Sequence, residues 1–163
     1  MKPLSLLLAL LLVSSAIAYP RKLAALVPEL SVLTSFAHDY GDSVASVHFR
    51  GTAYEPADAS EKILPLLEWT KRSDREALGA AWVEEICLQG WEIVTPERPG
   101  SEGVPGPTSE ILSDGTFRYT ATAISMRGRS PGSEWARWQF DITPEGKITS
   151  TALAKSEDQP WRR

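Results

Sequence analysis

The two histidines of the chain, His38 and His48, are its candidates for acid–base chemistry. Imidazole titrates near neutral pH, and the carboxylate of the adjacent Asp39 would raise the pKa of His38. His38, Asp39 and His48 are therefore our candidate catalytic residues. The competing interpretation is structural: His38 would lie at the end of a helix closed by Gly41, and His48 on a solvated strand face.

The remaining motifs argue against other chemistries. Neither histidine lies in a His-Glu-x-x-His spacing, and the single cysteine, Cys87, cannot form a multi-thiolate site. Ser-x-x-Lys, Gly-x-Ser-x-Gly and phosphate-binding glycine loops do not occur in a convincing context. We predict no metal and no cofactor, and we favour a non-catalytic protein over an enzyme.

A second set of residues suggests binding. Trp135 and Arg137 have the same parity in a predicted strand, opposite to Trp138 and Phe140. Tryptophan and arginine are over-represented at binding hot spots, so these two residues predict a surface for a protein partner or a second copy. The arginines of the preceding turn would extend this surface: Arg127 and Arg129. The alternative is incidental exposure, or packing on the second side of the sheet.

Predicted helices occupy the first half of the chain. Helical spacing of leucines predicts a helix over Lys22–Ala37, in which Pro28 is a kink or the first turn. A short helix is predicted over Ser60–Thr70. Ser73 and Glu76 predict a capping box at the start of the next helix, and Gly90 predicts its end. That helix should bury Leu78, Trp82, Val83 and Ile86, and turn Glu84 and Glu85 to water.

Predicted strands dominate the second half. Ser43–Arg50 and Trp91–Thr95 have strand patterns, and the Pro- and Gly-rich segment 96–109 is a predicted loop. An antiparallel meander follows, with tight turns at Asp114-Gly115 and Pro144–Gly146. Its strands are predicted at Glu110–Leu112, Thr116–Met126, Glu134–Thr143 and Lys147–Ala154.

Helices followed by a meander predict an α+β fold, with N-terminal helices packed on a C-terminal antiparallel sheet. This element order resembles the cystatin-like and NTF2-like folds. The resemblance implies a curved sheet that wraps a helix, in some cases with a pocket between them. Such a pocket supports an alternative function, a small-ligand-binding or acid–base enzyme domain.

The N-terminus has the three-part layout of a secretory signal peptide. A basic start at Lys2 precedes an apolar run from Leu4 to Val13, and small residues lead to a cleavage site after Ala18. An uncleaved anchor is the alternative, but Arg21 ends the run below the ~20 apolar residues that a membrane span needs. We expect a secreted or periplasmic protein without a stable membrane span. The predicted layout is a signal at 1–18, one domain at 19–155 and a polar tail at 156–163.

The net charge and the single cysteine limit the kinds of partner and of covalent link that the chain can have. The formal net charge is −4 and basic residues do not cluster, which argues against nucleic acid as a partner. One cysteine excludes an intramolecular disulfide. We interpret Cys87 as a small buried hydrophobe, with pairing between chains as the alternative. The sequence thus favours an exported domain that binds a macromolecular partner or assembles with itself.

Overall fold

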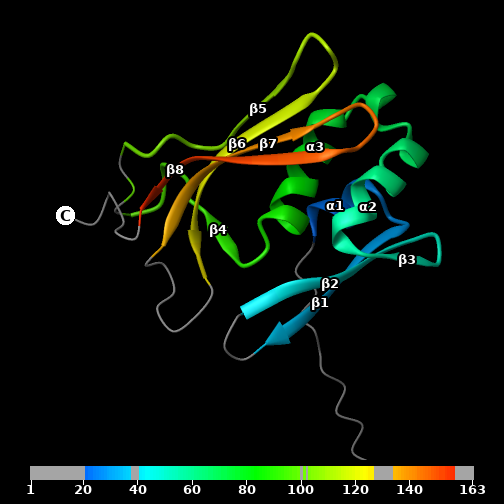
Figure 1. Cartoon of the computed structure of the whole chain (residues 1–163), viewed down its shortest axis with the longest axis horizontal. Helices are drawn as coiled ribbons and strands as arrows, with labels where there is room; N and C mark the ends of the chain where they lie inside the picture. The colour runs from blue at the N-terminus through cyan, green and yellow to red at the C-terminus, as the bar shows by residue number, and fades with distance from the viewer. Residues whose placement is uncertain (1–20, 38–40, 100, 102, 127–133, 157–163) are drawn as a thin grey trace, which may run out of the picture.

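The computed structural model describes residues 21–37, 41–99, 101, 103–126 and 134–156. Its antiparallel strands form two sheets: β1-β2-β3, and β4-β6-β7-β8 with β5 also paired to β6. In Figure 1 the helices lie between the two sheets. The predicted α+β class is confirmed. The elements are α1 Lys22–Leu26, β1 Leu30–Ala37, β2 Gly41–Phe49, β3 Thr52–Tyr54, α2 Pro56–Ile63, 3₁₀ turns Pro65–Leu67 and Trp69–Lys71, α3 Arg75–Trp82, the π turn Val83–Cys87, β4 Trp91–Ile93, β5 Thr108–Ile111, β6 Phe117–Ser125, β7 Trp135–Ile142 and β8 Ile148–Ser156.

The large sheet follows the predicted meander. The predicted tight turns are present, with Gly115 and Gly146 at positive φ of 83° and 87°. Alternation sends one set of side chains toward α3, which packs on β5 and β6. The face toward α3, here called the inner face, contributes these buried side chains to the core: Phe117, Tyr119, Ala121, Ala123, Ala136, Phe140 and Ile142.

Helix α3 approaches the large sheet very closely. A Cβ atom added to Gly79 would lie 2.7 Å from the ring of Phe117, so only glycine fits without a shift of that ring. The predicted buried face of the helix is confirmed, since Leu78, Trp82 and Val83 are all buried. Gly90 has the positive φ, 81°, expected of a residue that ends a helix.

The predicted helix over Lys22–Ala37 is wrong beyond Leu26. Val27 and Pro28 end α1 after five residues, and β1 begins at Leu30. Leu30 is buried, Ser31 is exposed and Val32 is half-buried, which is the period-2 pattern of a strand. The leucines of this segment have the spacing of a helix, which is why a helix was predicted. The pairing of β1 with β2 instead imposes the two-residue period of a strand.

The connection predicted after the second strand contains regular structure. Arg50 and Gly51 both have positive φ, 49° and 81°, and so form the tight turn between β2 and β3. The predicted helix over Ser60–Thr70 begins earlier, at Pro56 in the first turn of α2, and Pro65 starts a separate 3₁₀ turn. Proline fits both positions because its missing N–H is not needed there.

The capping box predicted at Ser73 does not form. The residue before α3 is Asp74, and its side chain makes no cap hydrogen bond. Arg72 holds the Asp74 carboxylate instead, with two bonds of 2.7 Å. A bidentate guanidinium–carboxylate pair outcompetes a neutral cap bond, and it lowers the pKa of Asp74.

The cystatin-like or NTF2-like arrangement is not confirmed. The first half of the chain contributes few helices, and it contributes a three-stranded sheet that those folds were not expected to need. The two sheets share one core, in which Val47 and Phe49 from β2 join Trp82 and Phe117. The predicted signal at 1–18 and most of the predicted tail, from 157 on, lie outside the described residues.

Candidate interaction face and polar network

Trp135 and Arg137 lie on the face of the large sheet that points away from α3, here called the outer face. Arg137 stands opposite Thr122 on β6, and its guanidinium donates a 3.2 Å hydrogen bond to the Thr122 hydroxyl. Trp135 stands opposite Ile124 on the same face. Both side chains are half-buried, and their cross-strand neighbours Thr122 and Ile124 are buried, so this end of the outer face is only partly open to solvent. The parity predicted from the sequence therefore places the two residues together.

Polar pairs cover the rest of the outer face. Arg118 on β6 forms a two-bond ion pair with Asp141 on β7, at 2.8 and 3.0 Å. Gln139 donates to the same carboxylate at 3.2 Å. The charges of Arg118 and Asp141 compensate one another, whereas Arg137 on the same face bonds to a neutral hydroxyl. Such a surface suits a partner recognised by shape, hydrogen bonds and aromatic contact.

Strand β8 forms one edge of the large sheet. In the described part of the chain, it pairs with β7 on one side and with no strand on the other. Its central side chains, from Thr149 to Thr151 and from Leu153 to Lys155, are exposed, and Leu153 is 50 % exposed. Lys155 is the only charged residue in the strand. The sequence predicted this strand but did not indicate that its edge would be open.

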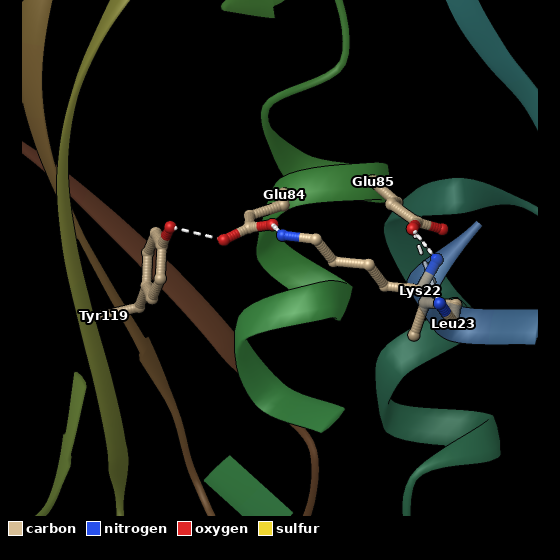
Figure 2. A network of polar contacts seen from close by, with 5 residues as sticks. All are labelled: Lys22, Leu23, Glu84, Glu85 and Tyr119. Carbon is tan, nitrogen blue, oxygen red and sulfur yellow. Dashed lines mark hydrogen bonds and ion pairs between the residues drawn. The ribbon is translucent and has the colours of Figure 1, made fainter. Parts of the chain in front are cut away.

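Glu84 and Glu85 point into the protein, where the sequence predicted that they face water (Figure 2). Tyr119 on β6 donates a 2.7 Å hydrogen bond to Glu84, and the ammonium of Lys22 lies 2.5 Å from the other Glu84 oxygen. Only 17 % of the Glu84 side chain is exposed. The prediction assumed 3.6 residues per turn throughout. Since the π turn breaks that period at Val83, the face of the residues after it could not be extrapolated.

Glu85 caps the first helix from a distance. One of its carboxylate oxygens accepts the main-chain N–H groups of Lys22, at 2.5 Å, and Leu23, at 3.4 Å. Arg21, at the N-cap position of α1, makes no cap bond because a guanidinium has no acceptor atom, and it donates instead to the carbonyl of Val32 on β1. Burial raises the pKa of Glu85, although the two main-chain bonds favour its charged form.

The Glu84–Glu85 network is therefore best explained as a structural tie between α1, the π turn after α3, and β6. Three of the four carboxylate oxygens have a partner within the network. The fourth, Oε2 of Glu85, is buried without a hydrogen-bond partner among the described residues. Burial, followed by the bond to Glu84, raises the pKa of Tyr119, which keeps this phenol protonated as a donor.

His48 forms a pair that the sequence did not single out. Its Nε2 atom lies 2.8 Å from the hydroxyl of Ser46, two residues earlier on β2. Both side chains are half-buried on the strand face opposite Val47 and Phe49. The period of two in a strand was the signal that could have identified Ser46. A hydroxyl at hydrogen-bond distance from an imidazole is the first requirement of a serine nucleophile.

The other predicted site residues have different outcomes. His38, Asp39, Arg127 and Arg129 lie outside the described residues. Cys87 is a free thiol packed against the core, and burial raises its pKa to about 12. The predicted packing of Cys87 as a small hydrophobe therefore holds in part, since its side chain is half-buried.

Within ranges 21–37, 41–99, 103–126 and 134–156, no three His, Cys, Asp or Glu side chains group so as to hold a metal ion. In that same part of the chain, no helix has the length and apolar character needed to cross a membrane.

The fold and the candidate face define an α+β protein with two antiparallel sheets around a shared helical core. No protein-family model, curated protein or solved structure gives a significant match to this chain.

Proposed function

We propose that this chain is an exported, non-catalytic domain that binds a macromolecular partner, or a second copy of itself, through the outer face and open edge of its large sheet. The observation that carries the proposal is the placement of Trp135 and Arg137 on one face, next to the hydroxyl-rich strands β6 and β8. Export is proposed on the layout of residues 1–18.

Exposed apolar side chains lie at the same end of the sheet. Met126, directly after β6, is 44 % exposed, and Leu153 on β8 is 50 % exposed. Strand alternation places Met126 on the side of Ile124 and Trp135. Apolar and aromatic side chains beside compensated polar pairs give the composition of a protein–protein interface core with a polar rim.

The test is recovery of a partner from the compartment in which the protein is found. Tagged wild type, Trp135→Ala and Arg137→Ala would be crosslinked in the producing cells and purified. If the two side chains are hot spots, each variant should recover about tenfold less partner or second copy. Leu33→Ala is the matched control, because Leu33 is 57 % exposed on the other sheet. Unchanged recovery with both variants would contradict the proposal, provided that circular dichroism shows all proteins folded.

A second candidate function is supported by the 2.8 Å contact between Ser46 and His48. This pair could transfer acyl groups from an activated ester, with His48 accepting the Ser46 proton. Hydrolysis of p-nitrophenyl acetate that disappears in both Ser46→Ala and His48→Gln would support it. Equal rates for the wild type and both variants would exclude it.

The alternative of a pocket between helices and sheet finds less support. Where α3 crosses β6, the Phe117 ring fills the space next to Gly79, and both residues are buried. The polar groups nearby, Tyr119 and Glu84, already bind one another. We therefore place the ligand-binding and acid–base enzyme functions behind the binding of a macromolecule.

A further inference from the structure

We infer that β8 pairs antiparallel with β8 of a second copy about a two-fold axis at Ser150, which joins two large sheets into one. The inference rests on the proposed function and names a second copy of this chain as the partner at the sheet edge. An antiparallel pair of identical strands is self-complementary, as a two-fold interface requires.

Strand β8 is the longest sheet edge in the described part of the chain. It has nine residues, whereas β4 has three and β5 has four. The other long edge strand, β1, has eight residues, and Arg21 already binds the carbonyl of its Val32. Long strands with an unpaired row of N–H and C=O groups readily accept another strand unless charge or proline protects them.

The hydrogen-bond pattern identifies the groups that β8 offers. Thr143 donates its main-chain N–H to the Lys147 carbonyl at 2.9 Å, at the start of the β7–β8 pair. Antiparallel ladders alternate between hydrogen-bonded and non-hydrogen-bonded pairs, so Thr149 and Thr151 bond to β7. The N–H and C=O groups of the intervening residues point outward: Ile148, Ser150 and Ala152.

A two-fold axis at Ser150 pairs these three residues with one another. Ser150 faces Ser150 of the second copy, and Ile148 faces Ala152 of the second copy. This register permits about six main-chain hydrogen bonds, two for each hydrogen-bonded pair. The irregularity in the β7–β8 pairing at Leu153 disturbs the strand there and ends the regular pairing.

Charge selects this register. With the axis at Ser150, extending the register past Leu153 brings Lys155 near Glu145 in the β7–β8 turn of the second copy, and the symmetry makes two such pairs. An axis one residue along, at Thr151, would instead bring Lys155 against Lys147 of the second copy. Glu145, Lys147 and Lys155 are all exposed, so each is available to a second copy. Opposite charges across paired strands are favourable and like charges are not.

The experiment measures self-association of the purified exported protein by sedimentation velocity over a range of concentrations. Ser150→Pro removes an outward N–H without touching the β7–β8 hydrogen bonds, and it should weaken the dimer by about tenfold or more. Ser150→Ala is its control and should leave the dimer unchanged, because the main-chain bonds remain.

Charge reversal keeps the inference falsifiable if Ser150→Pro fails to fold. Lys155→Glu and Glu145→Lys should each weaken the dimer, and the double variant should restore it. A wild type that stays monomeric at all concentrations would overturn the inference, as would a dimer that none of these variants alters. In that case, loss of partner recovery with Trp135→Ala would still support the proposed function, so the two failures are distinguishable.

Discussion

The hydroxyl of Tyr119 on β6 donates a 2.7 Å hydrogen bond to Glu84 in the π turn that follows α3. Lys22, from α1, approaches the other oxygen of the same carboxylate. One side chain thus connects the large sheet to the first helix of the described chain, as Figure 2 shows. The stability of α1 should depend on this connection, because α1 has only five residues and no cap of its own.

Replacing Tyr119 with Phe should lower the free energy of unfolding by about 1–3 kcal/mol. The variant leaves one oxygen of the half-buried Glu84 carboxylate without its hydrogen-bond donor. Lys22→Ala should cost less, at most about 1 kcal/mol, since the Lys22 side chain is 66 % exposed. Urea denaturation of the two variants and the wild type measures both values. A larger loss with Lys22→Ala than with Tyr119→Phe would contradict this ranking.

Glu85 should make the protein less stable as the pH rises. Its folded-state pKa is raised by burial, so its contribution to stability is present below the unfolded pKa and is lost as the pH rises through the folded pKa. Glu85→Gln removes this titration. The stability of the wild type relative to the variant should therefore fall as the pH rises above about 4, the ordinary pKa of a glutamate. Thermal unfolding of both proteins below and above that pH tests it, and a difference that is constant or rises with pH would be inconsistent with the raised pKa.

Gly79→Ala should destabilise the protein by about 1–3 kcal/mol despite the better helix propensity of alanine. The added Cβ would meet the Phe117 ring at 2.7 Å. Phe117→Leu removes part of that ring, so the double variant should lose less stability than the two single variants together. Chemical denaturation gives the three values, and simple additivity would show that the two residues do not meet.

Cys87 should be unreactive in the folded protein. Its pKa of about 12 leaves very little thiolate at pH 8, and packing against the core restricts access. Ellman's reagent should label the thiol slowly in buffer and rapidly in urea. Rapid labelling of the native protein, or a disulfide-linked dimer on a non-reducing gel, would favour pairing between chains instead.

The second half of the chain was predictable because its local signals agree with its tertiary structure. Alternating residues from Phe117 to Ala123 are buried as expected, and the glycine turns at Gly115 and Gly146 are in place. The first half was less predictable, since Leu30 and Leu33 have helical spacing but lie in a strand, where Leu30 is buried and Leu33 is exposed. The pairing of β1 with the next strand, β2, decides in favour of the strand.

The candidate sites show the same division. The parity of Trp135 and Arg137 followed from strand periodicity, and the structure places both on one face. The inward turn of Glu84 and Glu85 did not follow, because a π turn has no clear sequence signature and shifts every residue after it. The open edge of β8 also required the strand order of the whole sheet.

The central claim is that the large sheet meets a macromolecule through its outer face and edge. The most direct measurement is site-specific photo-crosslinking in the producing cells, with the photoreactive residue at Thr151 on β8 or, as a control, at Ser31 on β1. Both positions are exposed. We predict a discrete adduct, to a partner or a second copy, at Thr151 and none at Ser31. Adducts at Ser31 alone, or at neither position, would contradict the claim.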